Sequence, residues 1–305
     1  MEYELIYYAM QIFDPVQIPS QQLHRLLLGA IAPRPIAFAS TIDREGKPNL
    51  SPFSCFNVFG VNPTTLIFSP SRSGRTNSLK DTYLNVKEVP EVVINVVTFD
   101  MVQQASLAST EYPRGTNEFI KSGFTQIPSE KVRPFRVKES PFQIECKVRQ
   151  VIETGTVGGA ANLIICEVLL MHIDENIFDE RGFIDPDKIN LVGRMGGNYY
   201  VKASGSAVFK VPKPNDKMSL GIDALPESVR MSSILTGNEL AQLGSLENFP
   251  TAVEVAKFVK SDLVRQMQIK CAGEPELFLK EVHQTARKLI AKGEVIEAMK
   301  LLLAV

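Results

Sequence analysis

Short apolar runs separated by polar turns dominate the first two thirds of the chain. Residues 142–153 alternate apolar and polar side chains, which is typical of a half-buried strand, and residues 161–173 form a longer apolar run. A glycine-containing turn at 155–159 joins the two and predicts a hairpin. Further strands are predicted at 35–42, 49–57, 65–69 and 91–97. The polar turn between the first two of these predicts a second hairpin.

Helix signals lie between the strands. Residues 76–89 place Leu79, Tyr83 and Val86 on about one face, and Thr76 or Asn77 is the predicted N-cap. Residues 100–109 predict another helix, because they begin with an Asp and are rich in Ala and Gln. Many short strands with local turns, and no regular alternation of strand and helix, favour an antiparallel barrel over a doubly wound sheet.

The hydrophobic pattern changes near residue 205. Residues 211–216 resemble a linker, with two prolines among polar residues. Beyond them, residues 251–258 and 275–303 carry apolar side chains at helical spacing. The sequence therefore predicts a mainly β part followed by a C-terminal helical extension.

Composition narrows the functional class. The chain has 305 residues, 33 Lys+Arg and 34 Asp+Glu, so its net charge is −1. That balance argues against a dedicated nucleic-acid binder, which needs a basic excess. No run approaches the roughly 20 apolar residues that span a bilayer, and the N-terminus does not resemble a secretory signal. We expect a cytoplasmic protein.

The few cysteines and histidines do not suggest a metal site or a disulfide framework. Cys55, Cys146, Cys166 and Cys271 show no C-x-x-C spacing, and the three histidines are far apart in the sequence. Cys55 is expected to be a buried apolar residue, with a redox thiol as the alternative. His172 is expected to be a hydrogen-bonded residue at a strand end, with a role near a nicotinamide as the alternative.

The chemically informative stretch is residues 33–82. Small hydroxyl and aromatic residues mix along 49–57, a pattern that can hold a planar ring. Residues 69–75 add hydroxyls and two arginines, and Lys80-Asp81-Thr82 follows at a predicted helix start. Positive charge beside free backbone N–H groups suits a phosphate. The pattern suggests a planar cofactor with a phosphate tail; polar surface loops beside a Phe-rich core are the alternative.

The order of these stretches is similar to that in the flavin reductase-like family, whose domain is an FMN-binding split barrel. The resemblance is carried by APRPIAF, ASTIDREGKPNLSPFSCFN, NPTTLIFSPS, SLKDTYLNV and EVVINVV, then by residues 115–119, 139–146 and 192–199. It covers about residues 20–205. It implies an antiparallel Greek-key split β-barrel at 20–205, with the helical extension at 206–305.

The resemblance also implies a set of cofactor-binding residues. The residues expected to line the isoalloxazine ring are Ser51, Pro52, Phe53, Ser54, Cys55, Phe56 and Asn57. Those expected near the ribityl chain or the phosphate are Arg34, Ser40, Thr41, Ser69, Arg75, Lys80, Asp81 and Thr82. Asp81 is expected to organise Lys80 or to cap the helix rather than to bind the phosphate directly. Arg194 and Tyr199 are expected to close the site from the partner subunit of a homodimer with flavin at its interface.

The leading hypothesis is an FMN-binding oxidoreductase, an NAD(P)H:flavin reductase that transfers hydride from the nicotinamide to FMN. No catalytic residue is assigned, because the cofactor carries that chemistry. Arg34 is the candidate for stabilising the reduced flavin. One alternative is an FMN-binding electron carrier or sensor whose helical tail binds a protein partner. Another is a flavin-free barrel that binds a different planar ligand.

Overall fold

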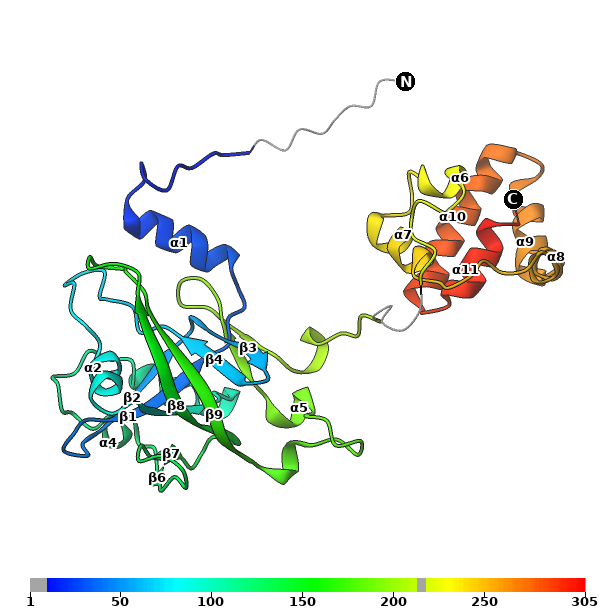
Figure 1. The fold of residues 1–305 in the computed structure, drawn as a ribbon. Coiled ribbons are helices and arrows are strands. Elements are labelled where there is room, and N and C mark those ends of the chain that lie inside the picture. The colour runs from blue at the N-terminus through cyan, green and yellow to red at the C-terminus, as the bar shows by residue number, and fades with distance from the viewer. Residues whose placement is uncertain (1–9, 213–217, 305) are drawn as a thin grey trace. The chain divides into compact units, whose positions relative to one another are not determined.

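The computed structural model describes residues 10–212 and 218–304. The chain divides into two compact units, Met1–Phe209 and Lys210–Val305, which we describe separately (Figure 1). Among the described residues, all strands belong to the first unit, and the second unit consists of helices and their connections.

A seven-stranded sheet forms the framework of the first unit. Its strands lie in the order β2-β1-β5-β8-β9-β4-β3. Their bounds are β1 Ala37–Ile42, β2 Pro48–Phe53, β3 Phe56–Val61, β4 Thr64–Phe68, β5 Glu91–Asn95, β8 Phe142–Glu153 and β9 Asn162–Ile173. Every neighbouring pair in this sheet is antiparallel, which confirms the predicted β architecture.

The long β8–β9 hairpin crosses the middle of the sheet and is drawn in green in Figure 1. The strand predicted for 142–153 is confirmed, and Ile144, Cys146 and Val148 all pack into one buried cluster. Successive side chains on a strand point to opposite faces, so these three share the core face. A register shift between Glu145 and Cys146 marks an irregularity in the ladder.

The two edge strands of the sheet, β2 and β3, are neighbours in the chain. Only Ser54 and Cys55 separate them, a link that spans roughly 10 Å at most. The two edges therefore approach each other at this corner, and the sheet curls toward closure. The single strand predicted at 49–57 was wrong for this reason: its first part pairs with β1 and its last part with β4.

Shorter elements complete the first unit. Two small antiparallel pairs are β6 (Gln126–Ile127) with β7 (Arg136–Val137), and β10 (Val192–Arg194) with β11 (Tyr200–Lys202). The α-helices are α1 (Ser20–Ala30), α2 (Asp81–Glu88), α3 (Val102–Leu107), α4 (Glu118–Ser122) and α5 (Pro186–Ile189). The 3₁₀ turns are η1 (Phe99–Met101), η2 (Glu175–Ile177) and η3 (Gly205–Ala207).

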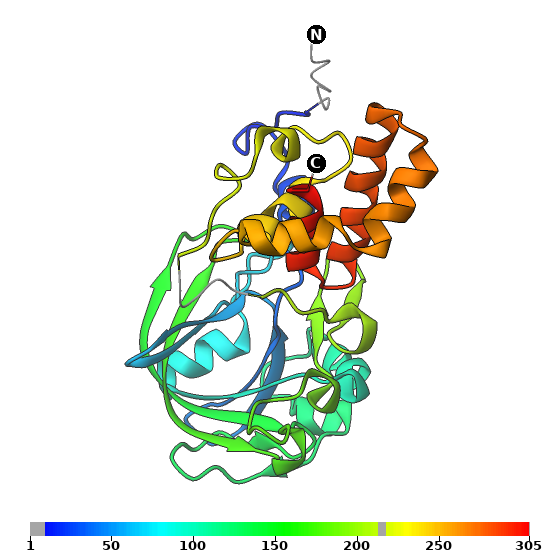
Figure 2. The same ribbon diagram turned by 90° about the vertical axis from the view of Figure 1, so that its right-hand side faces the viewer.

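Helix α2 begins five residues later than predicted. It lies beside β1 and β2 (Figure 2) and starts at Asp81, so neither Thr76 nor Asn77 caps it. Asn77 has a left-handed φ of 57°, which a helix does not accept. Its side chain instead accepts a hydrogen bond from Nε of Arg72 at 2.8 Å. The residues before α2 therefore form an ordered loop.

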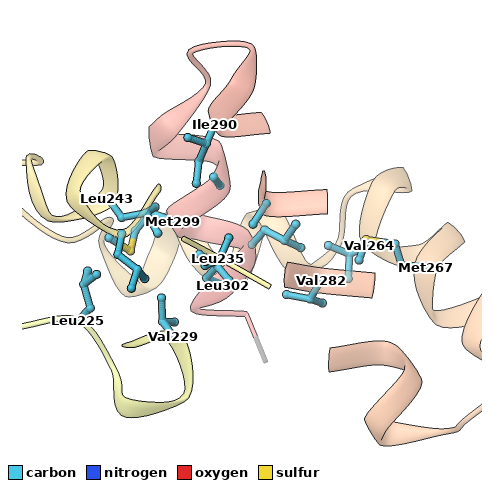
Figure 3. Close-up of a cluster of buried hydrophobic side chains, with 14 residues drawn as sticks. Leu225, Val229, Leu235, Leu243, Val264, Met267, Val282, Ile290, Met299 and Leu302 are labelled. Atoms are coloured by element: carbon cyan, nitrogen blue, oxygen red, sulfur yellow. The ribbon is translucent and has the colours of Figure 1, made fainter. Parts of the chain in front are cut away.

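The second unit is a group of helices around its own core. Their bounds are α6 Glu227–Arg230, α7 Gly237–Gly244, α8 Ala252–Val259, α9 Asp262–Cys271, α10 Pro275–Ala291 and α11 Val295–Leu302. The helix predicted over 275–303 is two helices, because Gly293 adopts a φ of 83° and reverses the chain. Leu235, Leu243, Met299 and Leu302 meet in the core (Figure 3). In the described residues no helix has the length and apolar character to cross a membrane.

Candidate functional site

The loop that precedes α2 is held by the tip of the β8–β9 hairpin. The backbone N–H of Arg72 donates to the carbonyl of Ala160 at 2.9 Å, and the N–H of Gly159 donates back to Arg72 at 3.1 Å. A side-chain carbon at Gly158 would lie 2.8 Å from the Ser73 carbonyl oxygen. The loop and the hairpin therefore touch backbone to backbone, and glycine makes that approach possible.

A pocket opens beside the N-terminus of α2. Its walls come from β2, the loop before α2 and the loop between α3 and α4. The lining residues are Asn49, Ser51, Ser78, Leu79, Lys80, Asp81, Thr82, Ala108, Ser109, Thr110, Glu111, Tyr112 and Glu118. The fold thus brings together Ser51, Lys80, Asp81 and Thr82, four of the residues that the sequence suggested for a cofactor site.

Two cations converge on Glu111, a carboxylate that lines this pocket, and we call the set of Arg75, Lys80 and Glu111 the cradle. Nζ of Lys80 lies 2.6 Å from Oε1 of Glu111, and a guanidinium nitrogen of Arg75 lies 3.2 Å from Oε2. The hydrogen bond from Lys80 is the main reason why the pKa of Glu111 is lowered. The cradle therefore combines two positive charges with one negative charge.

The N-terminus of α2 adds to the same positive field. Lys80 is the N-cap residue, and Asp81 and Thr82 open the first turn. The first amides of a helix have no intrahelical acceptor and point outward, where they can donate to an anion. The carboxylate of Asp81 lies 3.4 Å from Arg114. Asp81 therefore has a protein partner in this unit, and its role at the phosphate stays a prediction.

Glu118 is a further carboxyl group in this pocket, which the sequence reasoning did not assign. It is 6% exposed, and its Oε2 accepts a hydrogen bond from the backbone N–H of Leu50 at 3.0 Å. Burial raises the pKa of Glu118. Residues 115–119 had supported the family resemblance, which was a signal for Glu118. Glu111 had no such signal in the sequence.

Four buried polar side chains form a hydrogen-bonded group at the wall of the pocket. Nδ2 of Asn49 donates to the hydroxyls of Thr41 and Thr82, at 3.2 and 2.9 Å. Nδ2 of Asn85 also donates to Thr41. Thr41 and Thr82 are almost fully buried. Both hydroxyls accept hydrogen bonds from the protein, and their contact with a cofactor stays a prediction.

Ser40 and Ser69 complete the expected group around the phosphate. Ser40 is fully buried, so its side chain also lies behind the wall, and its hydroxyl has no hydrogen-bond partner within the described residues. Ser69 is 6% exposed; its hydroxyl lies 3.3 Å from that of Ser71 and accepts a bond from the N–H of Asn162. Neither residue lines the pocket.

The corner between β2 and β3 carries the residues expected beside a planar ring. Phe53 packs against Phe68 with ring centroids 5.8 Å apart, and Phe56 also packs on the barrel core. Ser51, Pro52 and Ser54 are half-buried, whereas Cys55 and Asn57 are exposed. The expectation of a buried Cys55 was wrong, because the residue sits at the turn between strands rather than inside one.

Arg34 is a structural link in this unit. It is 7% exposed, and its guanidinium donates to the carbonyls of Leu28 and Ile31, both at 2.7 Å, and to that of Met195 at 3.1 Å. It also donates to Oγ of Ser54. These four bonds use most of the five donors of an arginine. Arg34 therefore ties the end of α1 to the β10–β11 hairpin and to the corner.

Arg194 and Tyr199 do not line the cradle pocket. The guanidinium of Arg194 stacks on the ring of Tyr200, 4.6 Å from its centroid, and Tyr199 is 77% exposed. At the end of β9, Nε2 of His172 lies 2.7 Å from Oε1 of Glu145, which confirms the hydrogen-bonded interpretation of this histidine.

Comparison with known proteins assigns the first unit to a family. A model described as the flavin reductase like domain matches residues 29–189. An uncharacterized protein of Aquifex aeolicus is 37% identical over 189 residues, which cover 62% of this chain and 94% of that protein. Residues 210–305 lie outside the family match.

Solved structures agree with this assignment. Nitrilotriacetate monooxygenase component B from Bacillus cereus is 28% identical, with a TM-score of 0.62, and the match covers 67% of this chain and 100% of that one. A flavin reductase with a split barrel domain from Shewanella frigidimarina, described as putative, is 23% identical with a TM-score of 0.55, over 65% of this chain and 95% of that one. The second likeness concerns the fold alone.

Proposed function

The chain belongs to the flavin reductase-like family and has its split-barrel fold, and from this premise we propose that it binds FMN and oxidises NAD(P)H. The observation that carries the proposal is the cradle. Lys80 and Arg75 both pair with Glu111, and Lys80, Glu111 and the first residues of α2 line the same pocket. An FMN phosphate is an anion of the kind that this arrangement favours.

The residues present fit a phosphate-bearing flavin. Lys80, Arg75 and the first amides of α2 would hold the phosphate, and Ser51 would face the ribityl hydroxyls from β2. The backbone at the β2–β3 corner would meet the polar edge of the flavin ring. When bound, FMN supplies the hydride-accepting chemistry, and the chain contributes binding, orientation and a fixed electrostatic environment.

Reductase activity is proposed rather than electron carriage because the family's name and a match to a monooxygenase component both point to redox catalysis. The second candidate is an FMN-binding carrier or sensor whose helical unit binds a protein partner. One observation favours it: the helical unit has its own core and exposes apolar side chains, including Val253 at 79% and Ile269 at 70%.

We also propose that the protein is a homodimer. Strand β3 is an edge strand, and it exposes Val58, Phe59 and Val61 by 56%, 64% and 82%. Exposed apolar edges are typical of surfaces that pair with another chain. Sedimentation of the full chain would test this: a single monomeric species at micromolar concentration would contradict it.

Reduction of bound flavin separates the two candidate functions. The full chain is loaded with FMN, separated from free flavin, and mixed anaerobically with NADH or NADPH while flavin absorbance is followed. Bleaching within seconds by either nucleotide supports the reductase. A protein that keeps FMN but is not bleached supports the carrier, and a protein that does not retain FMN contradicts both.

The matched variant is Lys80→Gln. We expect it to weaken FMN binding by about tenfold, because one charge-assisted hydrogen bond is lost. Riboflavin lacks the phosphate, so its affinity should not change. Equal losses for both flavins would show that Lys80 does not act through the phosphate.

A further inference from the structure

A second cleft lies on the other side of the loop between α3 and α4. It lies between η1, α3 and the β10–β11 hairpin. Its lining residues are Phe99, Val102, Gln103, Ser106, Ser109, Val192, Arg194, Asn198, Tyr200, Val201 and Lys202. Ser109 also lines the cradle pocket, so the two spaces are neighbours.

The cleft pairs each of its two cations with an aromatic ring. The guanidinium of Arg194 lies 4.6 Å from the centroid of Tyr200, and Nζ of Lys202 lies 4.6 Å from the centroid of Phe99. Such contacts fix the direction of a long, otherwise mobile cation. Flat apolar surface and positive charge are therefore presented together on two sides of one space.

The positive charge of this cleft is not compensated by the protein. The lining contains no Asp or Glu, and neither Arg194 nor Lys202 forms an ion pair within the described residues. The contrast is Arg181, which stacks on Phe183 but is also paired with Asp179 at 3.0 Å. An arginine carries five donors, and those of Arg194 have no acceptor in the described part of the chain.

We propose that this cleft binds a planar anion, an aromatic ring that carries a carboxylate or a phosphate. The ring would lie against Tyr200 or Phe99, and the anionic group would accept hydrogen bonds from Arg194 and Lys202. Gln103, Ser106 and Asn198 supply further polar groups for orientation. Binding here is independent of flavin; a role as the second substrate rests on the proposed function, because the ligand would lie beside the flavin pocket.

Two classes of ligand have this chemistry, and a binding experiment can distinguish them. One is a small aromatic carboxylate, and the other is a nucleotide, whose base is the ring and whose phosphate is the anion. We would titrate the full chain calorimetrically with benzoate and with AMP, with and without saturating FMN. Benzyl alcohol and inorganic phosphate control for ring and charge alone.

The expected result is that benzoate or AMP binds at least tenfold more tightly than both controls, and that FMN does not displace it. The probe that binds more tightly shows whether the ligand is an aromatic carboxylate or a nucleotide. Binding no tighter than that of the controls would overturn the proposal. Competitive displacement by FMN would also overturn it, because the cleft would then belong to the flavin site.

Variants connect the binding to the two cations. Arg194→Gln and Lys202→Gln should each weaken the better probe by about tenfold, whereas Arg181→Gln, a stacked arginine outside the cleft, should leave it unchanged. Lys202→Gln should retain FMN as the unmodified chain does. Equal effects of Arg181→Gln and Lys202→Gln on the probe would contradict the assignment. An unmodified chain that binds the probe but does not retain FMN would count against the proposed function and not against this cleft.

Discussion

At the scale of single residues, Glu111 governs how much positive charge the cradle offers. Its carboxylate holds both Lys80 and Arg75, and a phosphate that enters the pocket must compete with it for them. Glu111 comes from the loop between α3 and α4, 31 positions after Lys80 in the chain. No local pattern in the sequence indicates this pairing.

We therefore expect Glu111→Gln to strengthen FMN binding, by about three- to tenfold, because a neutral amide competes less well for the two cations. Fluorescence titration of FMN and of riboflavin measures the effect. Riboflavin serves as the control, since it lacks the phosphate. A variant that binds FMN more weakly would show that Glu111 helps the ligand rather than competing with it.

Glu145 is a single residue that makes the free energy of unfolding depend on pH. Its carboxylate is fully buried and accepts hydrogen bonds from the backbone N–H groups of Glu130, Lys131 and Val132. Burial raises its pKa, but these bonds and the contact with His172 outweigh burial, so the pKa lies below the ordinary 4.5. The charged form is therefore favoured by folding.

Because folding lowers the pKa of Glu145, this carboxyl group stabilises the protein less as the pH falls. A carboxyl with a lowered folded pKa stabilises the protein fully above its unfolded pKa, and the gain is lost as pH falls through the folded pKa. Glu145→Gln should lower the free energy of unfolding at pH 7 by about 2 kcal/mol. Denaturant titrations at pH 7 and pH 4 measure this. The difference between variant and parent should shrink at the lower pH; a constant difference would contradict the assignment.

At the scale of elements, the β8–β9 hairpin sets the position of the loop before α2. The contact is between backbones, at Gly158 and Ser73, so the loop has no room for a side chain there. The same hairpin tip accepts a hydrogen bond at Thr156 from Nδ2 of Asn77. The loop that carries Arg75 and leads to Lys80 is thus positioned by an element more than 70 residues away.

Gly158→Ala should displace this loop and weaken FMN binding by about tenfold, with little change in the barrel itself. A matched control is Gly155→Ala in the same turn, where the added carbon would meet only the Ala160 side chain at 3.4 Å. FMN titration and circular dichroism of both variants test this. Equal FMN affinities in the two variants would show that the hairpin does not position the loop.

Elements also differ in how well their sequences predict them. The bounds of β8 agree with the predicted 142–153, because alternation over twelve residues is a strong local signal. Helix α2 was predicted to begin five residues too early, since the helical pattern continued through Asn77 but the backbone did not. Contacts of the loop with Thr156 and Ala160, distant in sequence, decided where the helix begins.

At the scale of the whole molecule, the chain is two units with separate cores. Leu243 is fully buried in the helical unit, and Leu50 is fully buried in the barrel. The two cores share no residue. A core substitution in one unit should therefore change the stability of that unit and leave the stability of the other unchanged.

We expect Leu243→Ala to lower the stability of the helical unit by about 2–5 kcal/mol while FMN retention is unchanged. Leu50→Ala should do the converse, lowering the stability of the barrel and with it FMN retention. Calorimetry of the full chain with bound FMN reports both transitions, and only the barrel transition should rise with FMN concentration. Loss of FMN in Leu243→Ala at a temperature where both units are folded would show that the units are coupled.

The sequence by itself determined the antiparallel strands, the change to helices after the barrel, and the presence of Lys80 and Arg75 before a helix. Periodicity, composition or a short motif among neighbouring residues predicts each of these features. The tertiary structure decided that Glu111 joins the two cations, that Arg34 links α1 to the corner, and that Cys55 is exposed. These features depend on barrel closure, which brings β2 and β3 together and places distant loops in contact; periodicity along the chain does not carry that information.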